Sequence, residues 1–98
     1  MKREDILARL KPLEHRLRQN GVTALYLFGS TAREDGGDDS DVDLIFDYDP
    51  VSKFDLFDQA RLYLDIKDAL GRDVDLVSGR AMRPAFRARV TPEMVQVF

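Results

Sequence analysis

The sequence predicts a small α/β (α+β) domain, in which a mixed β-sheet is packed against helices. Short, nearly continuous apolar segments, typical of strands, alternate with longer segments whose apolar residues recur at helical spacing. The chain has 98 residues, a length that predicts one domain spanning residues 1–98. Hydrophobic residues make up 44% of the chain and charged residues 34%, as in ordinary globular proteins.

Composition argues against several classes of protein. No apolar run approaches the roughly 18 residues that a membrane helix needs. The first five residues, MKRED, do not resemble the start of a signal peptide. The chain has no cysteine, so disulfides and thiolate metal sites are excluded. We therefore expect a cytoplasmic protein without membrane association.

The net charge of −3 conceals an uneven distribution. Residues 34–49 carry eight acids and no base, whereas residues 79–98 carry four arginines and one glutamate. The acidic segment would repel a nucleic-acid backbone unless cations neutralise it, and it would attract a divalent metal or a basic partner. A solvated acidic loop is the simpler interpretation of such a run. We expect no direct binding of nucleic acid.

The N-terminal segment, residues 3–19, is predicted to be helical. Its apolar residues recur at helical spacing and would share one face; they are Ile6, Leu10, Leu13 and Leu17. Pro12 interrupts the pattern and either kinks the helix or begins a second one. His15 is the only histidine. It lies on this charged segment, and we assign it no catalytic role.

Four apolar segments are predicted to be strands. Residues 22–28 are apolar nearly throughout, as expected for a strand that is covered on both faces. Residues 42–47 form the second strand, and residues 74–77 form a third that contains one acid. Residues 94–98 are expected to form a last, edge strand, whose free edge is available to a partner.

The longest predicted helix follows the second strand. Ser52 is expected to be its N-cap, with Asp55 three residues later in a variant of the capping box, and Gly71 is expected to end it. A wide apolar stripe is expected to face the core; it comprises Leu56, Ala60, Tyr63, Ile66 or Lys67, and Leu70, widened by Phe57 and Leu64.

Two shorter helices are also predicted. Residues 31–34 would form one, followed by a polar loop at residues 36–39. Residues 84–90 would form the other, with Pro84 in its first turn. This second helix belongs to a basic segment that either faces a partner or substrate phosphates, or is solvated; its arginines are Arg80, Arg83, Arg87 and Arg89.

Three aspartates are candidates for a metal site. Asp41 and Asp43 are two residues apart at the start of a predicted strand, so their side chains would point to the same side. Two such carboxylates repel each other, and Mg²⁺ or Mn²⁺, which prefer oxygen ligands, would resolve that repulsion. Asp75 would join them if its strand neighbours the second strand. The alternatives are a polar strand start and a structural salt bridge.

The turn after the first strand is a candidate phosphate site. Gly29 has no Cβ, so the backbone there can approach a ligand closely. Ser30 would begin a helix, whose free N–H groups and dipole favour phosphate. Arg33, one helical turn later, would reach a phosphate or a nearby carboxylate. The alternative is a plain strand-to-helix turn with a solvent-facing arginine.

In combination these motifs resemble the minimal nucleotidyltransferases of the DNA polymerase β superfamily. The resemblance covers nearly the whole chain and rests on three motifs: Gly29-Ser30-x-Ala32-Arg33, Ser40-Asp41-x-Asp43-Leu44 and Val74-Asp75-Leu76-Val77. It implies the nucleotidyltransferase fold. Members of this family are often encoded beside a HEPN-domain protein, in pairs similar to toxin–antitoxin systems. Glu34 is a departure, because a glycine often follows the arginine.

The resemblance also implies an activity and a role for each site residue. Active members of the family transfer AMP from ATP to a tyrosine hydroxyl of the HEPN toxin, with two Mg²⁺ ions, or Mn²⁺, at the site. Metal binding and catalysis would fall to Asp41, Asp43 and Asp75. Nucleotide binding would fall to Gly29, Ser30 and Arg33. The implied partner is a HEPN-domain toxin, in a hetero-oligomer with this chain.

Three functions remain open on the sequence alone. The first is an antitoxin that transfers AMP to its toxin. The second is an antitoxin that neutralises the toxin by binding without catalysis, and the third is a subunit of a small-molecule nucleotidyltransferase. The first is favoured, because 98 residues leave little surface for holding a small acceptor, whereas a partner protein brings its own surface.

Overall fold

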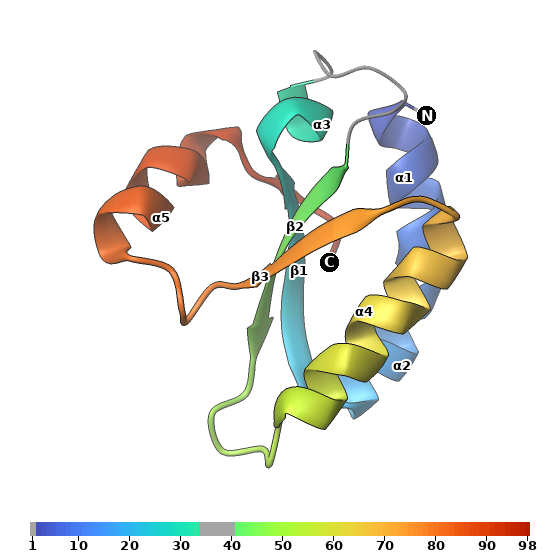
Figure 1. Cartoon of the computed structure of the whole chain (residues 1–98), viewed down its shortest axis with the longest axis vertical. Coiled ribbons are helices and arrows are strands. Elements are labelled where there is room, and N and C mark those ends of the chain that lie inside the picture. The colour runs from blue at the N-terminus through green and yellow to red at the C-terminus, as the bar shows by residue number, and fades with distance from the viewer. Residues whose placement is uncertain (1, 34–40) are drawn as a thin grey trace.

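The computed structural model describes residues 2–33 and 41–98, and its centre is a four-stranded sheet (Figure 1). The strand order is β3-β2-β1-β4, and the strands are β1 (Val22–Phe28), β2 (Val42–Tyr48), β3 (Val74–Ser78) and β4 (Val95–Gln96). β1 runs antiparallel to both β2 and β4, whereas β2 and β3 are parallel. The mixed sheet predicted from the sequence is therefore confirmed.

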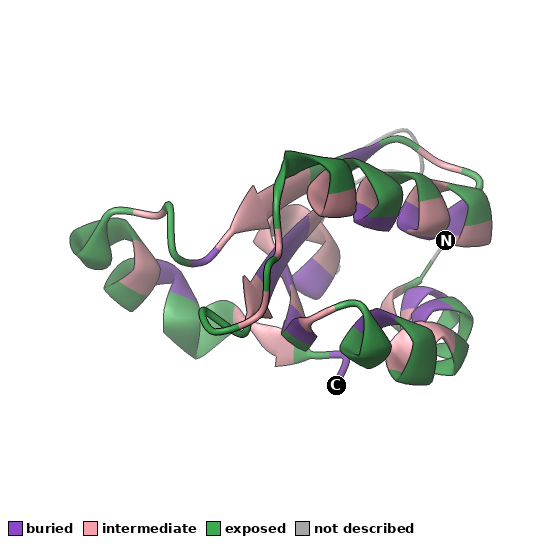
Figure 2. Cartoon of the chain, turned by 90° about the horizontal axis from the view of Figure 1, so that it is seen from below, coloured by how far each residue is buried: buried purple, intermediate pink, exposed green. Residues whose placement is uncertain are grey.

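Helices lie on both sides of this sheet, but unequally. The elements are α1 (Arg3–Leu10), the 3₁₀ helix η1 (Lys11–Leu13), α2 (Glu14–Gln19), α3 (Gly29–Arg33), α4 (Leu56–Leu70), α5 (Pro84–Val90) and the 3₁₀ helix η2 (Thr91–Glu93). Figures 1 and 2 show α1, α2 and α4 together on one face, with α5 on the opposite side. None of the helices in the described part of the chain is long and apolar enough to cross a membrane.

The hydrophobic core fills the space between the sheet and α1, α2 and α4. Alternate residues of the two central strands, among them Leu27 and Phe46, pack there against helix residues such as Ile6 and Ile66. Because side chains alternate along a strand, the residues between them project from the other face. Asp43 is one of these, so the fold directs it away from the core.

Pro12 divides the N-terminal helical segment. The segment consists of α1 and α2 joined by η1, in which Pro12 lies near the start. Proline has no backbone N–H and clashes with the carbonyl four residues earlier, so the chain passes through a tighter turn there. Ile6, Leu10 and Leu17 are buried as expected.

Element bounds differ from the predictions in several places. α3 begins at Gly29, two residues before the predicted start, and the strand predicted at residues 94–98 is paired only over Val95–Gln96. Val97 and Phe98 are nevertheless buried, and the Val97 amide donates to the Leu25 carbonyl at 2.8 Å. The predictions for Glu34 and for the loop at residues 36–39 concern residues outside the described ranges.

The start of α4 corrects the predicted cap. The N-cap is Asp55, not Ser52: the Asp58 amide donates to the Asp55 carboxylate, and the Asp55 amide donates to the Asp58 carboxylate, both at 3.0 Å. This is a capping box made of two aspartates. Ser52 instead donates its hydroxyl to the Asp49 carbonyl at 2.6 Å, within the preceding turn.

The apolar stripe predicted for α4 was also partly wrong. The fully buried residues of the helix are Leu62, Ile66 and Leu70. Leu56, Phe57 and Leu64, which were assigned to the core-facing stripe, are 81%, 83% and 57% exposed. The helix therefore carries apolar residues on two faces, and helical spacing alone does not decide which of them faces the sheet.

Replacing Asp55 by alanine is expected to lower the free energy of unfolding by about 1 kcal/mol, because the Asp58 amide loses the carboxylate that accepts its hydrogen bond. Chemical denaturation of the wild type and the variant measures the difference. Ser52→Ala is the matched control, and it should cost clearly less. Equal losses in the two variants would contradict the assignment of the cap.

Candidate active site

Two neighbouring strands, β2 and β3, bring acidic residues together beside the end of β1. The β1–β2 register pairs Phe28 with Asp43, and the β2–β3 register pairs Asp43 with Asp75. The last residue of β1 is thus in line with two aspartates, one on each of the next strands. Asp41 immediately precedes β2, two residues from Asp43. Asp75 was expected to join this cluster only if its strand neighbours the second strand. This condition is met, because β2 and β3 pair directly.

Asp43 is the acid of this cluster whose charge its neighbours affect most clearly. Asp43 is half-buried, whereas Asp41 and Asp75 are exposed. Burial, followed by the charges of Asp75 and then Asp41, raises the pKa of the Asp43 carboxyl above its ordinary value, and Arg33 opposes the change. The cluster therefore carries negative charge that the neighbouring side chains do not fully neutralise.

The donor set fits a hard divalent cation. Carboxylate oxygens are the preferred ligands of Mg²⁺ and Mn²⁺, and the repulsion around Asp43 is the kind that such an ion removes. Within residues 2–33 and 41–98, however, no group of three or more acids, histidines or cysteines already stands in a metal-binding arrangement. The argument that a divalent cation fits this site therefore rests on the chemistry of the carboxylate oxygens and on their negative charge.

Gly29 lies directly against the acidic cluster. Its φ is +70°, in the left-handed region that favours glycine, and a Cβ added there would collide with the Asp43 carboxylate. The turn and the aspartate are therefore packed as one unit, for which any side chain at Gly29 is too large. Ser30 follows in the first turn of α3, a helix of five residues.

Arg33 lies at the C-terminal end of α3 and reaches a carboxylate, one of the two outcomes predicted for it. Its Nη1 is 3.3 Å from Oε2 of Glu93 in η2, and both side chains are about half exposed. This partner lies 60 residues away along the chain and was not predicted from the sequence. Arg33 also lies near enough to Asp43 to oppose the rise of its pKa.

A second ion pair, which the sequence did not predict, joins α5 to the sheet. Arg87 donates to both carboxylate oxygens of Asp47, at 2.9 and 3.1 Å, and the hydrogen bond to Asp47 is the main cause of the raised pKa of Arg87. A Cβ added at Gly79 would collide with both side chains of the pair. Asp47 follows Asp43 by four residues on β2, so the pair lies on the same face of the sheet.

The basic segment is therefore only partly a solvated face. Besides the ion pair of Arg87, the guanidinium of Arg80 lies 5.5 Å from the centre of the Tyr48 ring and that of Arg89 lies 5.4 Å from the Phe86 ring. Arg83 is exposed. The neighbouring charge on Asp47 could have suggested a partner for one arginine, but not which one.

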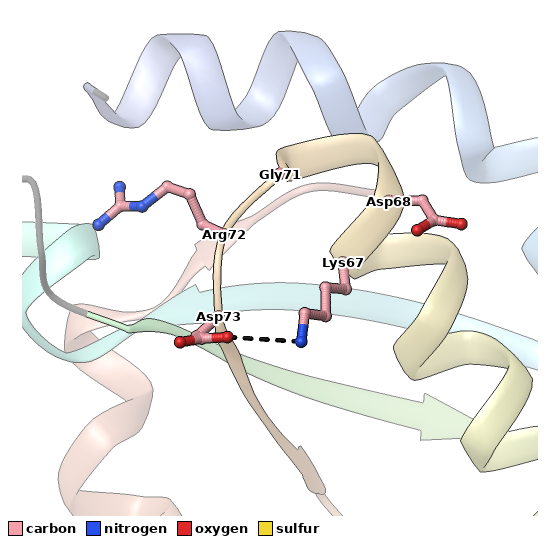
Figure 3. Close-up of a pocket in the computed structure, with 5 residues that line it drawn as sticks. All are labelled: Lys67, Asp68, Gly71, Arg72 and Asp73. Carbon is pink, nitrogen blue, oxygen red and sulfur yellow. Dashed lines mark ion pairs between the residues drawn. The ribbon is translucent and has the colours of Figure 1, made fainter.

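A shallow hollow elsewhere on the surface contains none of the predicted site residues. It lies at the C-terminal end of α4 and is lined by Lys67, Asp68, Gly71, Arg72 and Asp73 (Figure 3). Lys67 and Asp73 form an ion pair at 3.5 Å. The candidate active site is consequently defined by the strand register and by Gly29, and not by this hollow.

Comparisons of this sequence with protein-family models and with known proteins agree with each other. Residues 11–98 match the family model described as "Polymerase beta, Nucleotidyltransferase". The protein adenylyltransferase MntA of Thermococcus cleftensis is 32% identical over 95 residues, which cover 96% of this chain and 94% of that protein.

Solved structures support the same relationship. A candidate minimal nucleotidyltransferase superposes with a TM-score of 0.84 at 34% identity, over 97% of this chain and 95% of the other. A chain from a toxin–antitoxin complex, MntA–HpeT, has a TM-score of 0.65 at 27% identity, over 89% of this chain and 69% of the other.

Proposed function

The chain belongs to the polymerase β nucleotidyltransferase family, and from this premise we propose that it is an antitoxin that transfers AMP from ATP to a tyrosine hydroxyl of a HEPN-domain toxin. The observation that carries the proposal is the alignment of Asp43 with Asp75 beside the close turn at Gly29. The 32% identical relative is named a protein adenylyltransferase, and the 27% identical chain comes from a toxin–antitoxin complex. Because the reaction consumes ATP, we place it in the cytoplasm.

The proposed roles divide between metal binding and nucleotide binding. Asp41, Asp43 and Asp75 would hold two Mg²⁺ ions, or Mn²⁺ in their place, which when bound neutralise phosphate charge and lower the pKa of the attacking hydroxyl. Backbone amides at Gly29 and Ser30, with the Ser30 hydroxyl, would donate to the β- and γ-phosphates. The absence of a side chain at Gly29 lets the nucleotide approach the aspartates.

Arg33 is proposed to bind the nucleotide as well. It lies in α3, in the electrostatic neighbourhood of Asp43, and its half-exposed pair with Glu93 is weak enough for a phosphate to displace. A guanidinium binds phosphate oxygens more strongly than it binds one exposed carboxylate in water. Arg33 would then add positive charge where the triphosphate arrives.

The proposed chemistry is an in-line substitution at the α-phosphorus of ATP. A P–O bond forms to the tyrosine oxygen, the bond to the bridging oxygen of the β-phosphate breaks, and pyrophosphate leaves. The tyrosine proton would pass to Asp75, whose exposed carboxylate is open to an incoming side chain. Positioning and charge neutralisation would supply most of the rate enhancement.

Neutralisation of the toxin by binding alone is the second candidate function. The observation in its favour is that β4 forms one edge of the sheet, a place where a partner strand can be added. The two functions are compatible, because an adenylyltransferase must also bind its acceptor.

Co-expression with the toxin separates these two functions. We expect the wild-type chain to restore growth of cells that carry the toxin, and Asp43→Asn to fail although it accumulates to the same level. Asn preserves the size of the side chain, so the binding surface stays intact while the charge is lost. Full protection by Asp43→Asn would overturn the catalytic proposal and favour neutralisation by binding.

A further inference from the structure

The outer face of α4 carries a second apolar stripe that nothing in the described chain covers. Phe57, Arg61, Leu64 and Asp68 recur at helical spacing and are all exposed, Phe57 to 83% and Leu64 to 57%. The buried residues Leu62, Ile66 and Leu70 lie on the opposite side of the same helix. We name Phe57, Arg61, Leu64 and Asp68 the outer stripe. It points away from the core, so internal packing does not explain its apolar residues.

The hollow at the end of α4 lies on the line of the outer stripe. Gly71 follows Leu64 by seven residues, about two helical turns, and Phe57 precedes Leu64 by the same interval. A Cβ added at Gly71 would meet no atom within 4 Å, so the space above it is open. Figure 3 shows Lys67 on α4 pointing toward Asp73 in the segment that follows the helix, with Arg72 directed to the other side and no side chain at Gly71.

These positions are self-complementary under a two-fold axis. If two α4 helices cross antiparallel with Leu64 at the axis, Phe57 of each copy meets the hollow above Gly71 of the other. Arg61 lies three residues before Leu64 and Asp68 four residues after it, so the arginine of one copy faces the aspartate of the other, twice. The contact would thus have Leu64 at its centre, an arginine–aspartate pair on each side, and a Phe57 contact at each end, and such complementary charges give an interface its specificity.

We propose that the outer stripe binds a second copy of this chain, through an antiparallel two-fold contact between the α4 helices. The outer stripe lies on the side of α4 opposite its buried residues, which pack in the core against the sheet. Asp43 projects from the other face of that sheet, which α4 does not cover (Figure 1). Asp43 and Asp75 of both copies therefore stay accessible in the dimer. The contact involves one helix per copy, so it is smaller than the ~800 Å² per partner of a standard interface, and we expect a Kd of roughly 10–100 µM.

Sedimentation equilibrium of the full chain, from about 5 µM to about 1 mM, tests the proposal. The wild type should pass from monomer to dimer over this range. Phe57→Glu and Leu64→Glu should each weaken the dimer at least about tenfold while leaving the melting temperature nearly unchanged, because both side chains are exposed in the monomer. Phe86→Glu on α5 is the matched control and should dimerise like the wild type.

Charge reversal tests the geometry of the contact separately. Arg61→Asp and Asp68→Arg should each weaken the dimer, because like charges then face each other, and the double variant Arg61→Asp/Asp68→Arg should recover most of the affinity. Wild-type protein that stays monomeric at about 1 mM would overturn the proposal. Dimers that survive Phe57→Glu and Leu64→Glu would also overturn it. So would the finding that these substitutions disrupt assembly with the toxin and leave self-association unchanged.

Discussion

Replacing Asp43 by asparagine is expected to abolish AMP transfer while making the metal-free protein more stable. In the proposed mechanism Asp43 holds the metal, so its loss should lower the rate of transfer by at least about 10³-fold. The same carboxylate is half-buried among other acids, and its pKa is raised by burial and by Asp75 and Asp41. Asn removes the charge and keeps the shape, so the melting temperature at neutral pH should rise.

The pH dependence of this gain follows from the direction of the pKa shift. A carboxyl whose pKa is raised by folding binds its proton more tightly in the folded state. Its ionisation therefore begins to cost stability as the pH rises past the pKa of the unfolded chain, and the cost is complete above the folded pKa. The difference in melting temperature between Asp43→Asn and wild type should therefore be largest near neutral pH. It should vanish as the pH falls below 3.8, the ordinary value for this group.

A matched control is available on α1. Glu4 is exposed and far along the chain from the cluster, so Glu4→Gln should neither reduce AMP transfer nor raise the melting temperature. If Asp43→Asn lowers the melting temperature of the metal-free protein, the Asp43 carboxylate stabilises the fold instead of destabilising it. The interpretation that the charge of Asp43 destabilises the fold in the absence of metal would then be wrong.

Gly29→Ala is the second substitution for which a large effect is expected. Alanine is strained at a φ of +70°, and its Cβ would collide with the Asp43 carboxylate. The free energy of unfolding should fall by about 2 kcal/mol or more, and the displaced Asp43 should lower the rate of AMP transfer by about 10²-fold.

Gly71→Ala separates backbone strain from collision. Gly71 also has a left-handed φ, +65°, but a Cβ there meets nothing within 4 Å. It should cost only about 1 kcal/mol, the cost of the backbone conformation, and leave transfer unchanged. Equal losses of stability and activity in the two variants would show that the contact between Gly29 and Asp43 is unimportant.

Local sequence patterns were enough for the strands and for part of the site. The apolar runs located β1, β2 and β3, and the two-residue spacing of Asp41 and Asp43 beside a strand suggested the metal site. The strand assignments are confirmed. The metal site stays a prediction, which rests on the fixed two-residue period of side chains along a strand. Whether Asp75 lies near Asp41 and Asp43 depends on which strands pair in the sheet. The sequence does not show this pairing, so Asp75 was assigned to the site only on the condition that its strand neighbours the second strand.

Contacts between distant segments were beyond reach of the sequence. The pairs of Asp47 with Arg87 and of Arg33 with Glu93 join residues 40 and 60 positions apart, and many other acids could have served equally well. The prediction of which face of α4 is buried was partly wrong for a different reason. Its apolar residues lie on two opposite faces. Ile66 and Leu70 are buried as predicted, whereas Leu56, Phe57 and Leu64 are exposed.

The intact mass of the toxin tests the central proposal most directly. The purified HEPN-domain partner is incubated with this chain, ATP and Mg²⁺, and its mass is compared with that of samples lacking ATP or containing Asp43→Asn. We expect increments of one AMP, located on tyrosine by fragmentation, only with the wild-type chain and ATP. A toxin that binds the chain tightly but keeps its original mass in every sample would contradict the proposed transfer.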